Sequence, residues 1–308
     1  NQFDPFAIEE GRIVTPEAGA NRNEWRLLRR LHLPAKFNEP QGSEIKRALV
    51  VDVETTGLNL ETDDVMQLAM LPFDYEVETG RILTVYKDQA FEGLREPAAP
   101  ISEEASLITG ITAEMVAGKE IDAEAVAAVV EHADLVIAHN SKFDRPMVEK
   151  IWDCFAEKPW GCTFDGVDWL RQGCSAGKLD YLGIQFGWFY DGHQALADCK
   201  ACLALLAQTL PKADVQVMAA VREAALKTEW LVPAVGAPFD LKEKLKQRNY
   251  QWRPEGQPNG RVWWTVIEDR DAEIAWLCEE IYGRKVEIKT YPVTASERYS
   301  ERLWGFSE

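Results

Sequence analysis

Apolar runs and runs with helical spacing follow one another along residues 47–231, and they predict an α/β domain. The apolar, β-branched run at residues 48–53 predicts a buried central strand. Residues 65–75 and 81–86 predict two further strands, with a turn between them at residues 78–80. We expect these three strands to form an antiparallel meander.

Helices and strands alternate after this meander. The expected strands are at residues 135–138 and 160–164, and the expected helices are at residues 112–117, 122–132, 141–155, 178–187, 194–210 and 211–230. A strand-rich first half and an alternating second half together predict a mixed five-stranded sheet with helices on its faces.

The pattern changes on both sides of this domain. Residues 1–46 predict an N-terminal extension, in which residues 23–31 combine helical apolar spacing with arginines and predict a short basic amphipathic helix. Residues 232–238 are rich in proline, alanine and valine, and they predict a linker between two domains.

Residues 239–308 predict a small α+β domain that is rich in tryptophan. Its expected elements are a basic helix at residues 241–248, a hairpin of residues 250–252 and 261–266, a helix at residues 271–282 and a final strand at residues 285–291.

Two interpretations of the tryptophans in this small domain stay open. Tyr250, Trp252, Trp263 and Trp264 lie among lysines and arginines, and such a mixture could stack on bases and hold phosphates. The same rings could instead form the core of a domain of about 70 residues, with or without a docked partner protein.

Composition indicates a protein with a substantial core and no membrane span. The 308 residues are 46% hydrophobic, yet no run approaches the roughly 18 apolar residues that a spanning helix needs. The first residues are polar and acidic, so we expect no signal peptide and a cytoplasmic location. The six cysteines show no disulfide pattern, and Cys199 and Cys202 lie on a predicted helix, which favours buried thiols.

The net charge of −17 is unusual for a protein that binds nucleic acid, but its distribution changes this interpretation. Residues 48–239 hold 14 basic and 31 acidic residues, whereas residues 20–47 hold 7 basic and 3 acidic residues. Residues 240–261 hold 6 basic and 3 acidic residues. The basic flanks could hold phosphates or be ordinary solvated surface, because local fields matter more than the total charge.

Acidic side chains follow the predicted central strand. Asp52 and Glu54 are two positions apart, so both side chains point to the same face of the strand. Two carboxylates on a buried strand repel each other, and a bound cation is the usual compensation. A solvated pair on the surface would give the same pattern, so these two residues alone are weak support for a metal site.

Two later segments add further acidic candidates. Asp144 lies in the first turn of a predicted helix, where an aspartate also favours the helix dipole, and Asn140 could be the N-cap. His193 opens another predicted helix that contains Asp198 within an apolar run. A carboxylate there is costly unless it is paired or binds a metal, which makes His193 and Asp198 the stronger pair.

Together these segments resemble the three motifs of the DEDDh 3′–5′ exonuclease superfamily, and they are similar to the epsilon proofreading subunit of bacterial DNA polymerase III. The matching segments are residues 51–58, 139–144 and 193–198. Residues 107–112 also resemble a segment of epsilon-type members. The resemblance covers residues 47–210, and none of the five core positions departs from the pattern.

This resemblance implies a ribonuclease H-like fold and two divalent cations, Mg²⁺ or Mn²⁺. Asp52, Glu54 and Asp198 would bind one cation. Asp52 would bridge to the second, which Asp144 would support directly or through water, and His193 would be the general base. The implied reaction releases nucleoside 5′-monophosphates from a 3′ end.

The resemblance also implies a pocket for the terminal nucleotide of a single strand. Its expected members are Thr55, Thr56, Leu58, Asn140 and Phe143, although Phe143 could equally belong to the core. Single-stranded DNA ends are the expected substrate, since a terminal base must leave its stack to reach the metals.

Other functions stay open at this point. The motifs do not separate DNA from RNA, so an RNA-trimming exonuclease is one alternative. A module that docks a polymerase or another replication or repair protein is a second alternative, and a hydrolase of small phosphodiesters is a third. Five costly polar groups in one pattern favour the active exonuclease.

Overall fold

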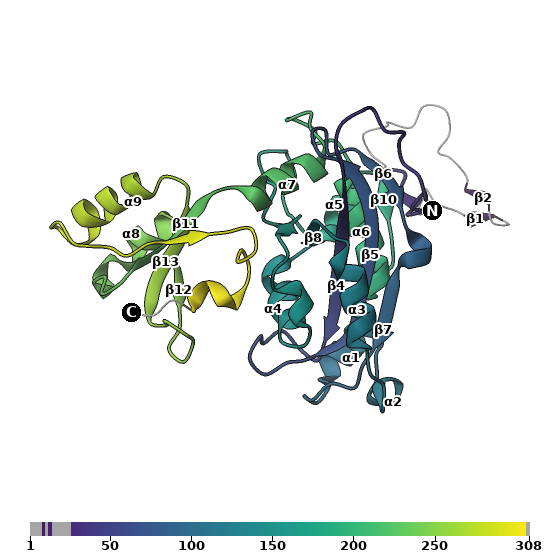
Figure 1. The fold of residues 1–308 in the computed structure, drawn as a ribbon, viewed down its shortest axis with the longest axis horizontal. Helices are drawn as coiled ribbons and strands as arrows, with labels where there is room; N and C mark the ends of the chain where they lie inside the picture. The colour runs from purple at the N-terminus through teal and green to yellow at the C-terminus, as the bar shows by residue number, and fades with distance from the viewer. Residues whose placement is uncertain (1–7, 10–11, 14–25, 306–308) are drawn as a thin grey trace, which may run out of the picture.

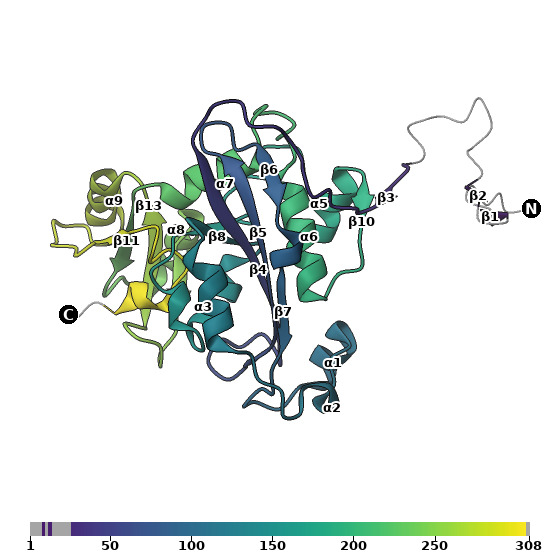
Figure 2. The same cartoon turned by 45° about the vertical axis from the view of Figure 1, so that its right-hand side comes forward.

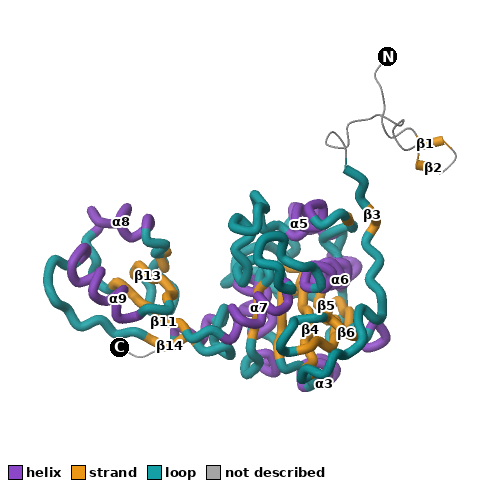
Figure 3. Tube along the Cα trace, turned by 90° about the horizontal axis from the view of Figure 1, so that it is seen from above, coloured by secondary structure: helices purple, strands orange, loops and turns teal. Residues whose placement is uncertain are grey.

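The computed structural model describes residues 8–9, 12–13 and 26–305 of the chain. In this part of the chain, two sheets form the centres of two units that α7 (Val217–Leu226) and β11 (Glu229–Ala234) join (Figures 1 and 3). None of the described helices is long and apolar enough to cross a membrane.

The larger unit contains a mixed six-stranded sheet in the order β6–β5–β4–β8–β9, with β7 paired to β5. Its strands are β4 (Ile45–Thr55), β5 (Val65–Glu76), β6 (Ile82–Val85), β7 (Phe91–Leu94), β8 (Leu135–Ala138) and β9 (Trp160–Cys162). β5 runs antiparallel to β4, β6 and β7, whereas β8 runs parallel to β4 and β9. This arrangement confirms the predicted ribonuclease H-like α/β fold.

Helices cover both faces of this sheet. They are α1 (Glu103–Thr109), α2 (Ala113–Val116), α3 (Ala123–Glu131), α4 (Ser141–Glu149), α5 (Leu179–Gln185) and α6 (Ala195–Leu206), with short 3₁₀ turns at Lys87–Gln89 and Asp153–Phe155. α5, α6 and α7 pack on the face that Ala48 and Val50 line. α3 and α4 pack on the face that Leu49 and Val51 line. Both faces of β4 are therefore buried, as its continuous apolar run predicts.

The smaller unit is a four-stranded antiparallel sheet in the order β12–β13–β11–β14. Its remaining elements are η3 (Phe239–Leu241), α8 (Lys242–Gln247), β12 (Gln251–Arg253), β13 (Val262–Ile267), α9 (Arg270–Trp276), a π-helical turn (Leu277–Ile281), β14 (Tyr291–Val293) and η5 (Glu301–Trp304). Most of its tryptophans contribute to its two apolar clusters, whereas Trp252 is 48% exposed.

The helix predicted at residues 23–31 is wrong where the structure describes it. Arg29–Arg30 form strand β3, which pairs in parallel with β10 (Trp188–Phe189). Arg29 and Leu31 donate backbone hydrogen bonds to this partner, and pairing of this kind outweighs the weak helical preference of a short segment. Residues 23–25 and most residues before them lie outside the described part of the chain.

The linker predicted at residues 232–238 is also wrong in its first half. Residues up to Ala234 belong to β11, so the predicted end of the exonuclease domain at residue 231 falls inside a strand. Pro233 is compatible with this strand because β14 pairs only with residues 229–231, which leaves the proline nitrogen beside no partner strand on that side.

Several smaller differences concern the ends and number of elements. β7 was not predicted, because Glu92 and Gly93 interrupt its apolar pattern. The helix expected at residues 141–155 ends at Glu149, and the strand expected at residues 285–291 overlaps β14 only at Tyr291. All six cysteines are free, and Cys199 and Cys202 are buried in the core, which confirms the prediction for this pair.

The side chain of Arg145 joins α4 to the C-terminal part of the chain. It is fully buried, and its Nε donates to Oε1 of Glu149 at 2.7 Å. Its Nη1 donates to the carbonyl of Arg298 at 2.8 Å, and its Nη2 donates to the carbonyl of Ala156 at 3.0 Å. Ser300 donates its hydroxyl proton to the same Glu149 carboxylate. Residues 295–302 therefore hold α4, the helix that carries Asp144 in its first turn.

We predict that Arg145→Ala lowers the free energy of unfolding by about 3–5 kcal/mol, because it removes the buried donor of Glu149 and of the carbonyls of Ala156, Ser296 and Arg298. Urea denaturation followed by tryptophan fluorescence measures this loss. Arg171→Ala is the control, since the Arg171–Asp168 pair is exposed and should contribute less than about 1 kcal/mol. Equal stability of the two variants would contradict the prediction.

Candidate active site

β4 brings Asp52 and Glu54 to the rim of the large sheet. Along this strand Ala48 and Val50 pack on the side of α6, and the same alternation places Asp52 and Glu54 on that side. The pairing with β5 shifts register between Glu54 and Thr55, so the regular ladder ends directly after the second carboxylate. The end of a central strand thus carries both acidic side chains.

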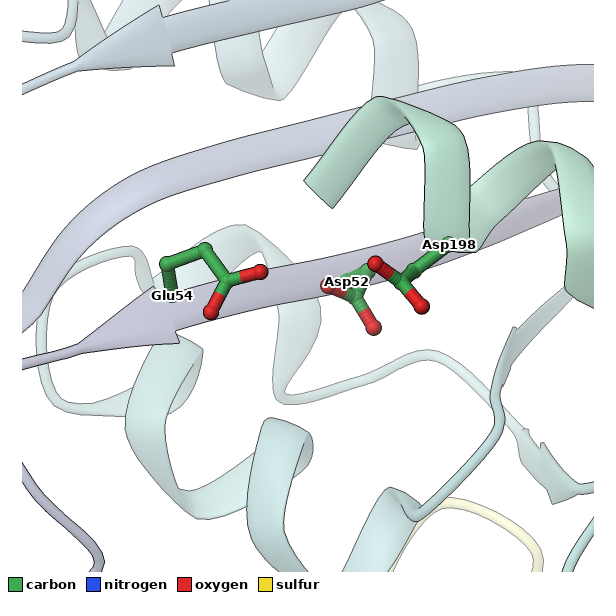
Figure 4. Close-up of side chains that lie close together, drawn as sticks. All are labelled: Asp52, Glu54 and Asp198. Carbon is green, nitrogen blue, oxygen red and sulfur yellow. The ribbon is translucent and has the colours of Figure 1, made fainter. Parts of the chain in front are cut away.

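α6 adds Asp198 to this pair. Ligand oxygens of Asp52, Glu54 and Asp198 all lie within 4.8 Å of one another (Figure 4). In Figure 4 the Asp198 carboxylate comes down from the first turn of α6 and faces Asp52 on the strand. Among the described residues, these three carboxylates are the one group of acidic, histidine or cysteine side chains whose ligand atoms lie close enough together to share a metal ion.

Asp144 lies beside this group, on α4 and against the backbone of β4. It is 4% exposed, and its Oδ1 accepts a hydrogen bond from the backbone N–H of Val53 at 3.3 Å. Its carboxylate does not join the group of three, but its charge acts on both Asp52 and Glu54. The predicted four carboxylates therefore meet around β4, with Asp144 set back from the others.

Burial and mutual repulsion make the charged forms of these acids unfavourable. Burial, with the nearby charges of Asp198 and Asp144, raises the pKa of Glu54 to about 8. Burial likewise raises the pKa of Asp144 to about 7, against the hydrogen bond from Val53. The pKa of Asp52 is raised well above its ordinary value by burial and by its acidic neighbours.

Asp198 has donors of its own. Tyr190 donates its hydroxyl proton to Oδ1 at 2.6 Å, and the backbone N–H of Gln194 donates to Oδ2 at 3.1 Å. Burial raises the pKa of Asp198, and these hydrogen bonds, together with the nearby His193, oppose the rise. Tyr190 thereby orients Oδ1 of Asp198, and the backbone N–H at the start of α6 orients Oδ2.

His193 lies in the turn just before α6. Its side chain is exposed, and its backbone has a φ of 63°, in the left-handed region that a non-glycine residue seldom adopts. The turn is not part of the helix, which begins at Ala195. The prediction that His193 opens the helix is therefore accurate to within two residues.

The predicted nucleotide-pocket residues differ in what they offer. Leu58 is 84% exposed, Asn140 is exposed at the N-cap position of α4 without a capping hydrogen bond, and Phe143 is half-buried against the core. Thr56 is fully buried, its N–H donates to the carbonyl of Asp64, and its hydroxyl donates to Asp63. The donors of Thr56 are thus already used within the loop.

Two residues at the site were missed from the sequence. Tyr190 binds Asp198, and Oε1 of Gln67 accepts a hydrogen bond from the N–H of Ala195 at 3.3 Å, which holds the start of α6 against β5. Neither residue belongs to a motif segment. The short distance in sequence between Tyr190 and His193 was the available signal for the first, whereas the pairing of Gln67 with Glu54 is visible only in the structure.

Comparison with known proteins decides the family. The RNase_T family, described as "Exonuclease", matches residues 49–206, which is slightly more than half of the chain. The chain belongs to this exonuclease family. The matched span contains β4, α4 and α6, and with them all of the motif residues of the DEDDh type.

Curated relatives of this exonuclease carry the name DNA polymerase III PolC-type. The protein of Lacticaseibacillus paracasei is 31% identical over 178 residues, which cover 56% of this chain and 12% of the relative. The protein of Thermotoga petrophila is 29% identical over 118 residues, which cover 36% of this chain and 8% of the relative. The matched region therefore spans about a tenth of the length of these polymerases.

Solved structures with a similar fold include two exonucleases. Exonuclease X in complex with 5′ overhanging duplex DNA is 24% identical, with a TM-score of 0.40, and covers 56% of this chain and 99% of its own. Exonuclease I of E. coli in complex with a dA16 oligonucleotide is 16% identical, with a TM-score of 0.44. The match covers 72% of this chain and 63% of Exonuclease I.

The four carboxylates fit divalent cations in their chemistry. Mg²⁺ and Mn²⁺ prefer hard oxygen ligands, and the group of three offers only carboxylate oxygens. None of the ion pairs among the described residues involves Asp52, Glu54, Asp144 or Asp198. A cation would supply the missing positive charge.

We predict that the metal-free protein loses stability between about pH 5 and pH 8. The folded protein holds the Glu54 proton more tightly than the unfolded chain, because the folded pKa is about 8. The stability from this group is therefore complete below its ordinary pKa of 4.5 and is lost as pH rises through about 8. Melting temperatures in the presence of a chelator measure the loss.

Glu54→Gln should reduce this loss, since the glutamine does not ionise, and a smaller loss should remain because the pKa of Asp144 is also raised. Glu61→Gln is the matched control, because Glu61 is exposed in the loop after β4. A loss as large in Glu54→Gln as in the wild type would show that Glu54 is not held in a protonated form.

Proposed function

We propose that this chain is a metal-dependent 3′–5′ exonuclease that removes nucleoside 5′-monophosphates from single-stranded ends, with DNA as the favoured substrate. The convergence of Asp52, Glu54 and Asp198 within 4.8 Å, inside a domain of the exonuclease family, is the observation that carries this proposal. Asp144 supplies a fourth carboxylate, which accepts a hydrogen bond from the backbone of Val53, the residue between Asp52 and Glu54.

The carboxylates would hold two ions, Mg²⁺ or Mn²⁺. Asp52, Glu54 and Asp198 would share one of them, and Asp52 would also reach a second, with Asp144 as its support directly or through water. When bound, such a pair of ions lowers the pKa of a water molecule and offsets charge on the attacking and leaving oxygens. Tyr190 would hold Asp198 in the orientation that this requires.

His193 would act as the general base. Its side chain is exposed, and it is close enough to Asp198 to act on that carboxylate electrostatically. A histidine can accept a proton near neutral pH, and a well-placed general base contributes roughly 10²–10⁴-fold to the rate.

The terminal nucleotide would lie against the exposed groups around the carboxylates. We propose contacts with Leu58 and Asn140, which are exposed, and with Phe143, which is half-buried. Thr55 is also proposed, through its backbone, because it is 7% exposed and its hydroxyl donates to the carbonyl of Gly57 at 2.6 Å. Any contact from Thr56 would be indirect, because its N–H and hydroxyl bind within the loop. An apolar side chain such as Leu58 suits an unstacked terminal base.

The preference for DNA rests on the curated relatives, whose name is that of a DNA polymerase. The same relatives support a setting in replication or repair, in which this chain would act with a polymerase. The geometry of the carboxylates is equally suitable for RNA, so the test of function includes both polymers.

We predict that the wild-type protein shortens 5′-labelled single-stranded oligonucleotides from the 3′ end in the presence of Mn²⁺, and that a chelator abolishes this activity. Asp198→Asn should lower the rate by at least about 100-fold, because metal ligation contributes several kcal/mol to the transition state. DNA and RNA of equal sequence, separated on a denaturing gel, give the rate and the preferred sugar.

Asp214→Asn is the matched control, since Asp214 is exposed and its left-handed backbone is one that asparagine readily adopts. Oligonucleotides with a blocked 3′ end should resist degradation. No shortening of either polymer by the folded, Mn²⁺-bound wild type would contradict the proposed function and would favour a small phosphodiester substrate or a docking role.

A further inference from the structure

The segment before the exonuclease domain crosses the domain surface as an extended strap. We define the N-terminal strap as residues 26–38, which connect the described start of the larger unit to the edge of its sheet. Figure 2 shows its strand β3 beside β10, next to α5 and α6. The strap lies outside the motif segments and supplies none of the four carboxylates.

One end of the strap holds the segment that precedes His193. The N–H of Arg29 donates to the carbonyl of Gly187 at 3.1 Å, and the N–H of Leu31 donates to the carbonyl of Phe189 at 2.8 Å. The guanidinium of Arg30 lies 5.1 Å from the centre of the Phe189 ring. β10 is a two-residue strand that pairs only with β3 among the described strands. Trp188 at its start is buried in the core, so the strap and the core together hold β10.

The other end of the strap is anchored on the sheet edge. The N–H of Val85 donates to the carbonyl of Ala35 at 2.8 Å, and the N–H of Phe37 donates to the carbonyl of Leu83 at 2.7 Å. Leu33 lies between these two ends and is buried in the core. The strap is therefore fixed to β6, which gives β10 a rigid support.

We define the His193 loop as residues 190–194. Its inner side is held by Asp198, which accepts hydrogen bonds from the Tyr190 hydroxyl and the Gln194 N–H. Its outer side is held by Arg30, whose Nη1 lies 2.8 Å from Oδ2 of Asp191. Between these two attachments the chain passes through Gly192 and through His193 in its left-handed conformation.

We propose that Arg30 is a positioning residue for His193, acting through Asp191. This inference rests on the proposed function, in which His193 is the general base. The contact does not stabilise the fold much, because the Arg30 and Asp191 side chains are 53% and 72% exposed and solvent screens such a pair. Its effect is on geometry, since a misplacement of about 1 Å near the reacting groups can cost about 100-fold in rate.

A double-mutant cycle tests this role. We expect Arg30→Ala to lower kcat by about 2- to 5-fold, with little change in the KM for a single-stranded DNA oligonucleotide or in the Mn²⁺ concentration dependence. In the His193→Ala background the same change should have no further effect on kcat, because the residue that Arg30 positions is absent. Arg30→Lys, which can still pair with Asp191, should recover part of the rate.

Lys36→Ala is the control for charge and for the strap itself. Lys36 lies at the other end of the strap and pairs with Glu39 on the surface. Its replacement therefore removes one positive charge without touching the His193 loop. We expect its kcat to equal that of the wild type. All variants should keep the wild-type melting temperature to within a few degrees.

The other outcomes are equally informative. An unchanged kcat in Arg30→Ala, or an equal loss in the presence and absence of His193, would overturn the positioning role. A rise in KM alone would show that Arg30 binds the substrate strand instead. Wild-type activity in His193→Ala would overturn the proposed base and this inference with it, whereas an inactive wild type would show that the proposed function itself has failed.

Discussion

Repulsion among buried carboxylates is the constraint on which the rest of the structure depends. Asp52, Glu54 and Asp198 share one small space at the end of β4, and Asp144 adds a fourth negative charge. Raised pKa values for all four show that the site is unfavourable as a set of bare anions. A protein keeps such a cluster only where another charge compensates it, and divalent cations suit these oxygen ligands.

The architecture supplies the rigidity that this cluster requires. β4 lies inside the sheet, with β5 on one side and β8 on the other, so Asp52 cannot move away from its neighbours. The helices that carry Asp144 and Asp198 are each held from outside the motif segments. Arg145 joins α4 to residues 295–302, and the N-terminal strap supports the loop before α6. The flanks of the chain therefore contribute to the site although neither supplies a carboxylate.

The sequence was sufficient to predict those elements whose conformation in the fold is the one that their own residue pattern favours. β4 was predicted because a buried strand between two helical layers requires apolar residues on both faces, and Asp52 and Glu54 were conspicuous against that run. β3 could not be predicted, because its conformation comes from pairing with β10, which lies about 160 residues away in the chain. Tyr190 lies close to His193 in the sequence, but only the fold shows that its hydroxyl meets the Asp198 carboxylate.

Anomalous diffraction from crystals grown with Mn²⁺ and a nucleoside 5′-monophosphate tests the central claim most directly. The account predicts two Mn²⁺ peaks at the end of β4. One should touch Asp52, Glu54 and Asp198, and the other should lie between Asp52 and the side of Asp144. Ions bound only elsewhere on the protein, with these carboxylates left unliganded at saturating Mn²⁺, would contradict the account.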